Sequence, residues 1–172
     1  MKPLISVYLT FFVAFGRAAA QQAAPTVVVP ADTEPWQVVA INSVSLRGTV
    51  KEGTPFEVNI ETKKPKASQG NYFGSADQPS LVIVEMAAKL GGEKISFPKQ
   101  AFDDLANASL QTVSVTSKPS GELRFRFSGG DEATRYEAEY FIQSGRLIKR
   151  SVSYFEATAD GKKREVVKTT TF

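Results

Sequence analysis

The chain lacks the two residue types that most often carry catalysis and bind transition metals. None of its 172 residues is histidine and none is cysteine. This excludes Ser-His-Asp and Cys-His nucleophile pairs, and zinc, haem or iron–sulfur sites that depend on imidazole or thiolate ligands. Carboxylates, Ser-Lys pairs and metals bound by oxygen remain as candidates. We therefore expect no catalytic residue, no cofactor and no metal site.

The carboxylates show no arrangement that predicts a catalytic pair. Asp103 and Asp104 are neighbours in a predicted helix, where adjacent side chains point about 100° apart, so a solvated helix face is the simpler interpretation. Glu137 and Glu139 share one face of a predicted strand, where they could pair with Lys149 across the sheet. No twelve-residue calcium loop is present, and no spacing singles out a Ser-Lys pair.

A long segment without strand periodicity, residues 63–80, is the best candidate for a contact site, and we call it the contact loop. Its candidate residues are three lysines and two adjacent aromatic residues: Lys63, Lys64, Lys66, Tyr72 and Phe73. A loop of this length in a compact domain is either functional or disordered. Two interpretations stay open: the aromatic side chains fold back onto the core, or they anchor a partner within a basic rim.

A second candidate surface lies in residues 146–168, where seven basic and three acidic residues give a local charge of +4. The residues predicted to form an anion-binding patch are Arg146, Lys149, Lys162, Lys163 and Arg164. Such charges either protect the edge strands from aggregation or contact an anionic polymer or lipid head group.

The first twenty residues have the features of an export signal. Lys2 precedes an apolar run from Leu4 to Phe15, and a cleavage site of small residues follows at Ala18 to Ala20. The apolar run is shorter than the roughly twenty residues that a membrane-spanning helix requires. We expect an exported protein, periplasmic or extracellular, that is not an integral membrane protein once the signal is cleaved.

The remaining chain is predicted to consist of an extended Pro- and Ala-containing linker, residues 21–35, and a single β-rich domain, residues 36–172. Removal of residues 1–20 takes away two basic residues, so the net charge falls from +3 to +1. This small excess argues against nucleic acid as a partner. The absence of disulfides favours a bacterial envelope protein over a small secreted eukaryotic domain.

The last third of the chain, Glu122 to Phe172, predicts a four-stranded antiparallel meander. From Glu122 to Phe127, apolar and charged residues alternate strictly, which is typical of a half-buried strand. The next strand is expected to place four residues on the same inner face: Tyr136, Ala138, Tyr140 and Ile142.

Turn lengths predict the two registers that follow. A three-residue loop ending at Gly145 would pair Tyr140 with Ile148. A three-residue loop ending at Gly161 would pair Glu156 with Arg164. The last residue of each loop needs a left-handed conformation, which glycine adopts without strain.

Earlier segments complete a mainly β pattern. Residues 55–62 and 110–116 alternate as strands, and the apolar run 81–86 predicts a central strand buried on both faces. Proline followed by apolar residues at helical spacing predicts one short helix at about residues 98–106. We expect an antiparallel sandwich or open barrel that ends in the meander.

These features favour a non-enzymatic binding or structural domain of the cell envelope that contacts a protein or an envelope polymer. One alternative is a carrier of small apolar ligands such as lipids. Its barrel would be lined by Phe125, Phe127, Tyr136, Tyr140 and Tyr154. The other alternative is a hydrolase that uses carboxylate or Ser-Lys chemistry.

Overall fold

The computed structural model describes residues 36–40, 42–50, 53–66, 71–76, 78–118 and 120–172. The predicted export signal and linker lie outside these residues, as do residues 67–70 and 77 of the contact loop. The described part contains ten strands: Trp36–Ala40 (β1), Ser43–Thr49 (β2), Pro55–Lys63 (β3), Val82–Leu90 (β4), Glu93–Ile95 (β5), Ala108–Ser117 (β6), Leu123–Gly129 (β7), Tyr136–Gln143 (β8), Arg146–Ala157 (β9) and Lys163–Thr171 (β10).

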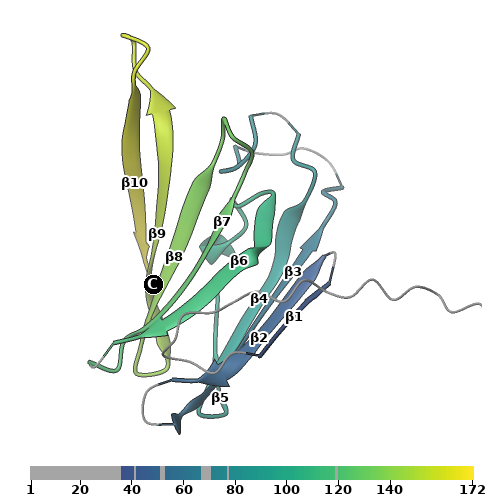
Figure 1. Cartoon of the computed structure of the whole chain (residues 1–172), viewed down its shortest axis with the longest axis vertical. Coiled ribbons are helices and arrows are strands. Elements are labelled where there is room, and N and C mark those ends of the chain that lie inside the picture. The colour runs from purple at the N-terminus through teal and green to yellow at the C-terminus, as the bar shows by residue number, and fades with distance from the viewer. Residues whose placement is uncertain (1–35, 41, 51–52, 67–70, 77, 119) are drawn as a thin grey trace, which may run out of the picture.

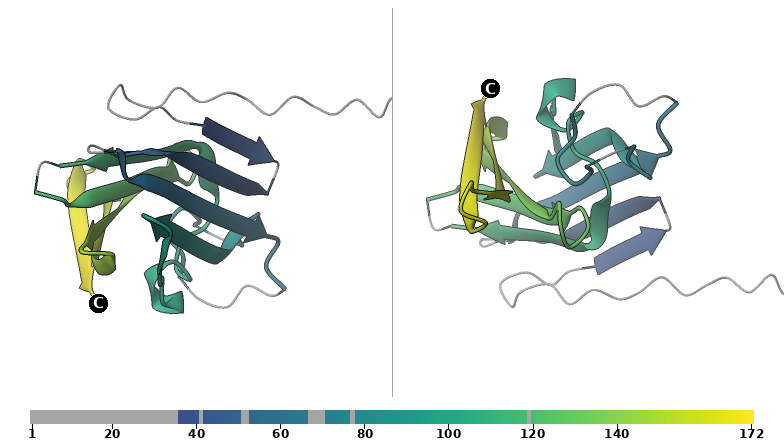
Figure 2. Two further views of the ribbon diagram at one scale, coloured as in Figure 1. Left: turned by 90° about the horizontal axis from the view of Figure 1, so that it is seen from below. Right: turned by 90° about the horizontal axis from the view of Figure 1, so that it is seen from above.

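The strands form two antiparallel sheets of five (Figure 1). The strand order is β1-β2-β3-β4-β5 in the first sheet and β10-β9-β8-β7-β6 in the second, so strands that follow one another in the chain are neighbours. The sheets meet where β6 lies against β2, and they do not close into one barrel (Figure 2). The β9–β10 hairpin extends beyond the other strands of its sheet (Figure 1). The prediction of a mainly β, antiparallel fold is confirmed.

The predicted inner face of the meander is also confirmed. Phe125 and Phe127 of β7 are fully buried, as are Tyr136 and Tyr140 of β8. The ring of Tyr140 stacks on Phe125 and Phe127, with ring centroids 5.4 and 6.0 Å apart. Burial of such large apolar side chains stabilises the fold by about 1.5–3 kcal/mol each.

The β9–β10 hairpin has the predicted register. Glu156 lies opposite Arg164, and their side chains form an ion pair of 3.3 Å. Gly161 has a φ of 77°, and its N–H donates to the carbonyl of Thr158 at 2.9 Å, which closes the three-residue loop.

The predicted register of β8 and β9 is wrong. The turn has two residues, Ser144 and Gly145, both at positive φ (49° and 72°), because this geometry matches the twist of the strands. A bulge then leaves Ile148 unpaired, with 41% of its surface exposed. Tyr140 therefore faces Arg150 and not Ile148.

The apolar run 81–86 predicted a strand buried on both faces, and this prediction is wrong. A bulge in β4 explains the difference. The partner of Glu61 is Glu85, whereas the partner of Thr62 is Ile83, so Val84 is the extra residue. Ile83 is buried, but Val84 is 41% exposed and Glu85 is exposed. The strand is half-buried, with one face toward the core.

The predicted helix at about residues 98–106 is absent, and only a single 3-10 turn, Lys99–Ala101 (η2), forms there. After this turn, two backbone groups of the stretch bond to Phe73 and not within a helix. The N–H of Phe73 donates to the carbonyl of Asp104 (2.8 Å), and the N–H of Ala106 donates to the carbonyl of Phe73 (2.9 Å). A helix this short has little stability alone, so these tertiary bonds decide the conformation.

The residues between β5 and β6, 96–107, are called the connecting segment below. Five of its apolar residues are buried although they form no α-helix: Phe97, Ala101, Phe102, Leu105 and Ala106. Among the described residues, no helix is long and apolar enough to span a membrane.

Candidate functional site

The connecting segment is bonded to both sheets. On the side of the first sheet, the N–H of Asn107 donates to the carbonyl of Leu81 just before β4 (2.9 Å). On the other side, the hydroxyls of Tyr140 and Tyr136 in β8 donate to the carbonyls of Ala101 (2.7 Å) and Ala106 (3.1 Å). These bonds fix the segment between the sheets.

An ion pair between a buried arginine and a half-buried aspartate strengthens this attachment. Arg150 of β9 is 4% exposed, and its guanidinium makes two bonds to the carboxylate of Asp104: Nη1 to Oδ1 at 2.5 Å and Nη2 to Oδ2 at 2.8 Å. Nη1 also donates to the carbonyl of Ala101 at 3.1 Å. Such a bidentate, charge-assisted pair is geometrically specific and holds Asp104 in one position.

The ionisation of these buried groups follows from their surroundings. Burial alone would lower the pKa of Arg150, but hydrogen bonding and charge interaction with Asp104 outweigh it, so this pKa is raised and the guanidinium stays charged. Burial raises the pKa of both Tyr136 and Tyr140, because their ionised forms would lose solvation.

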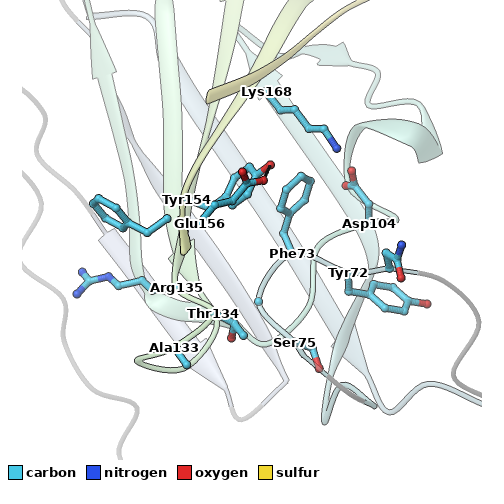
Figure 3. Close-up of a pocket in the computed structure, with 13 residues that line it drawn as sticks. Tyr72, Phe73, Ser75, Asp104, Ala133, Thr134, Arg135, Tyr154, Glu156 and Lys168 are labelled. Atoms are coloured by element: carbon cyan, nitrogen blue, oxygen red, sulfur yellow. Dashed lines mark hydrogen bonds between the residues drawn. The ribbon is translucent and has the colours of Figure 1, made fainter. Parts of the chain in front are cut away.

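An open pocket of about 470 Å³ lies beside this ion pair (Figure 3). Its walls come from the contact loop, the connecting segment, the turn before β8 and the β9–β10 hairpin. The lining residues are Asn71, Tyr72, Phe73, Gly74, Ser75, Asp104, Ala133, Thr134, Arg135, Tyr154, Phe155, Glu156 and Lys168. The pocket therefore joins segments that are far apart in the sequence.

Phe73 lies at the centre of this arrangement. Its ring centroid is 5.1 Å from that of Tyr154 and 6.5 Å from that of Tyr136, and the Nζ of Lys168 lies 5.3 Å from the ring centre (Figure 3). The side chain is partly buried against the core and also lines the pocket. Phe73 therefore folds back onto the core, as the first interpretation expected, and part of its side chain remains accessible from the pocket.

The other predicted residues of the contact loop are divided. Tyr72 is half-buried and lines the pocket. Lys63, Lys64 and Lys66 are exposed and are not among the lining residues, and Lys63 pairs with Glu61 at 2.9 Å. The structure therefore brings the two aromatic residues to the pocket but not the three lysines.

The residues of the predicted anion-binding patch fall into two groups. Arg146 and Lys149 lie at the β8–β9 turn, whereas Lys162, Lys163 and Arg164 lie at the far end of the hairpin. From Lys149 to Ala157, the partner of Lys163, the strand rises roughly 26 Å, so the two groups lie far apart. Lys162 pairs with Asp160 (3.2 Å), and the Nζ of Lys149 lies 4.1 Å from the ring centre of Phe141.

The sequence did not single out the ion pair between Asp104 and Arg150. A usable signal was nevertheless present, because Arg150 is in phase with Val152 and Tyr154 on the inner face of its strand. An arginine at such a position must find a buried partner. No local pattern indicated that Tyr154 and Lys168 meet the contact loop.

The carboxylates at the pocket already have partners. Asp104 is bound by Arg150, and Glu156 accepts from the hydroxyl of Tyr154 at 2.9 Å and pairs with Arg164. Within the described ranges, no group of three or more acidic side chains lies close enough to hold a metal ion. Comparisons with protein-family models, with curated proteins and with solved structures gave no match.

Proposed function

We propose that the chain is an exported, non-enzymatic binding domain of the cell envelope. It contacts a protein or an envelope polymer at the pocket between the contact loop and the β9–β10 hairpin. The observation that supports this most directly is the meeting of Tyr72, Phe73 and Tyr154 in an open pocket. Clustered aromatic side chains with polar neighbours are typical of anchor sites for a partner.

The pocket is held in shape before any partner binds. Phe73 is fixed by two backbone hydrogen bonds to the connecting segment, at Asp104 and Ala106. That segment is in turn fixed by Arg150. Groups that are already ordered lose little conformational entropy on association, so such a site favours binding.

The same geometry gives less support to a hydrolase. A general base must be able to take up a proton from the substrate. The carboxylate of Asp104 is occupied by both guanidinium nitrogens of Arg150, and that of Glu156 by Tyr154 and Arg164. Their arrangement suits fixed hydrogen bonding better than proton transfer.

The apolar-ligand carrier also has less support. The aromatic side chains proposed to line its cavity pack on one another, and the hydroxyls of Tyr136 and Tyr140 are satisfied by backbone carbonyls of the connecting segment. These groups need no ligand to complete their hydrogen bonds. Of the five aromatic residues, only Tyr154 is partly exposed, and its ring lies against Phe73 in the pocket.

Binding is tested with the Tyr72→Ala variant of the purified protein, assayed against solubilised envelope proteins and against sedimented envelope polymer. We expect at least a tenfold loss of binding with an unchanged melting temperature, because Tyr72 lines the pocket outside the core cluster. Val84→Ala, which alters an exposed apolar residue of the other sheet, is the matched control. Equal binding by both variants would show that the pocket is not the contact site.

Export is tested separately. Residues 1–20 are fused to a reporter that is active only outside the cytoplasm. We expect activity that disappears when the apolar run is interrupted by a charged residue. A reporter that stays inactive would exclude an exported protein while leaving the pocket experiment unaffected.

A further inference from the structure

β10 is an edge strand with an unusually regular form. It is hydrogen bonded on one side to β9, and its nine residues pair without a register shift. It contains no proline or glycine. In both views of Figure 2, β10 stands at the outside of its sheet. Long, straight edges of this kind are templates for pairing with another strand.

The bonds at the two ends of the β9–β10 hairpin show which backbone groups face outward. The N–H of Thr158 donates to the carbonyl of Lys162 (2.8 Å), and the N–H of Phe172 donates to the carbonyl of Ile148 (3.0 Å). Because bonded and non-bonded pairs alternate in antiparallel strands, the even-numbered residues of β10 bond to β9. The residues that direct their N–H and carbonyl groups to the outer side are Lys163, Glu165, Val167, Thr169 and Thr171.

The centre of this edge is apolar and exposed. Val167, the middle residue of β10, is 58% exposed. Phe155 is also 58% exposed and lies diagonally across from Val167 on the same sheet face, since its direct partner is Glu165 and that of Val167 is Ser153. Proteins commonly protect an edge with a lysine, a proline or a bulge, and this strand has neither a proline nor a bulge. Lys168 lies next to the centre, but its side chain is on the opposite sheet face from Val167, with its Nζ 5.3 Å from the ring centre of Phe73.

We propose that β10 pairs antiparallel with β10 of a second copy of this chain, centred on Val167. This register overlaps all nine residues and places Val167 opposite its counterpart, Glu165 opposite Thr169 and Lys163 opposite Thr171. The outward backbone groups of each copy then face those of the other, and the two copies form one continuous sheet. The contact is isologous and closed, so it produces a dimer and not a fibre.

Charge distinguishes this register from its neighbours. Centring the pair on Val166 would set Arg164 against Lys168, and centring it on Lys168 would set that residue against itself. Centring it on Glu165 would bring two carboxylates together. Like charges directly opposite are destabilising, which disfavours these three registers. Centring the pair on Thr169 sets no like charges opposite each other, but it overlaps only residues 167–171 of each strand, whereas the Val167 register overlaps the whole strand.

The register is tested with single cysteines, because the chain has none of its own. Residues in a hydrogen-bonded antiparallel pair have Cα atoms about 5.5 Å apart, within the range that a disulfide spans. Under mild oxidation we expect Val167→Cys to form a covalent dimer at least ten times faster than Thr169→Cys, whose partner in the other copy is Glu165. Equal rates would indicate random collision and overturn the proposal.

The dimer itself is tested by sedimentation velocity over a range of concentrations, with circular dichroism to check folding. We expect Val167→Lys and Val167→Glu each to raise the dissociation constant at least tenfold, and a mixture of the two to restore a dimer. Val167→Thr, which keeps a β-branched side chain, should change it less than threefold. A wild-type protein that stays monomeric throughout would refute the dimer. Tyr72→Ala should dimerise normally, since the inference does not rest on the proposed pocket.

Discussion

At the scale of single residues, the ion pair between Arg150 and Asp104 is asymmetric in its exposure. The side chain of Arg150 is 5% exposed and that of Asp104 is 33% exposed. Removing Asp104 therefore has different consequences from removing Arg150. An orphaned carboxylate at this position can be hydrated from the pocket, whereas an orphaned guanidinium remains buried and keeps only neutral partners such as the carbonyl of Ala101.

This asymmetry gives the first prediction. We expect Asp104→Ala to lower the free energy of unfolding by about 3–5 kcal/mol, because it leaves a buried charge uncompensated. Arg150→Met, which keeps most of the side-chain volume, should cost about 1–2 kcal/mol. Asp103→Ala is the matched control and should stay within about 0.5 kcal/mol, since Asp103 is exposed. Urea denaturation measures all three, and a larger loss for Arg150→Met would contradict the argument.

Asn107 is a second residue on which several loops depend. Its Oδ1 accepts from the N–H groups of Ser80 (3.0 Å) and Leu81 (3.1 Å), and its Nδ2 donates to the carbonyl of Gly74 (2.9 Å). Its φ is 51°, in the left-handed region that asparagine tolerates better than most residues. One side chain therefore links the contact loop, the start of β4 and the connecting segment.

Two substitutions of Asn107 separate hydrogen bonding from backbone strain. Asn107→Gly removes the three side-chain bonds but accepts positive φ, and we expect a loss of about 2 kcal/mol. Asn107→Ala removes the same bonds and adds strain, so its loss should be larger by about 1 kcal/mol. Thermal unfolding gives both values. Equal losses would mean that the backbone relaxes out of the left-handed region.

At the scale of elements, alternation predicted strands where one face is buried along the whole element. Leu123, Phe125 and Phe127 alternate with charged residues, and β7 has the expected inner face. The loop ending at Gly161 predicted the β9–β10 register because it sets the opposite charges of Glu156 and Arg164 across from each other. Alternation and turn length depend only on residues close together in the chain, so both could be predicted from the sequence.

Elements whose conformation depends on distant partners were not predictable in the same way. The connecting segment has helical spacing, but beyond its single 3-10 turn several of its backbone groups bond to distant residues, among them Phe73 and Leu81. The bulges at Val84 and Ile148 shift the phase of β4 and β9 without any local mark such as glycine. For the candidate site, the aromatic pair was predicted, but its meeting with Tyr154 was not.

The β7–β8 hairpin gives a prediction at this scale. Gly129 lies directly opposite Tyr136, and a Cβ at Gly129 would clash with the tyrosine ring and hydroxyl. Gly129→Ala should therefore cost about 1–3 kcal/mol through overpacking. In a Tyr136→Ala background the same change should cost less than about 0.5 kcal/mol, because the clash is gone. A double-mutant cycle by urea denaturation measures this coupling, and additive losses would show that the ring is not the obstacle.

At the scale of the whole molecule, the two sheets are held by more than direct packing. β6 lies against β2 on one side, and the connecting segment joins β8 and β9 to the region of β4 through hydrogen bonds. The buried tyrosine hydroxyls of β8 are part of this junction. Their protonation is therefore coupled to the stability of the entire fold.

This coupling predicts unfolding at high pH. The pKa values of Tyr136 and Tyr140 are raised by burial above the roughly 10 of an unfolded tyrosine, so the folded state keeps two protons that the unfolded state releases. Their stabilisation is complete below pH 10 and is lost as the pH rises further, with a slope that approaches about 2.7 kcal/mol per pH unit.

Urea denaturation from pH 8 to 11.5, with tyrosinate absorbance recorded in parallel, measures this slope. Tyr136→Phe should reduce the pH dependence by about half while costing about 1 kcal/mol at neutral pH for the hydroxyl bond. Tyr154, whose pKa is raised by its hydrogen bond to the carboxylate of Glu156, is half-exposed and serves as the comparison through Tyr154→Phe. Because solvent screens that group, its removal should change the slope less than removal of Tyr136 does. If both variants kept the wild-type slope, the junction between the sheets would not depend on the buried hydroxyls.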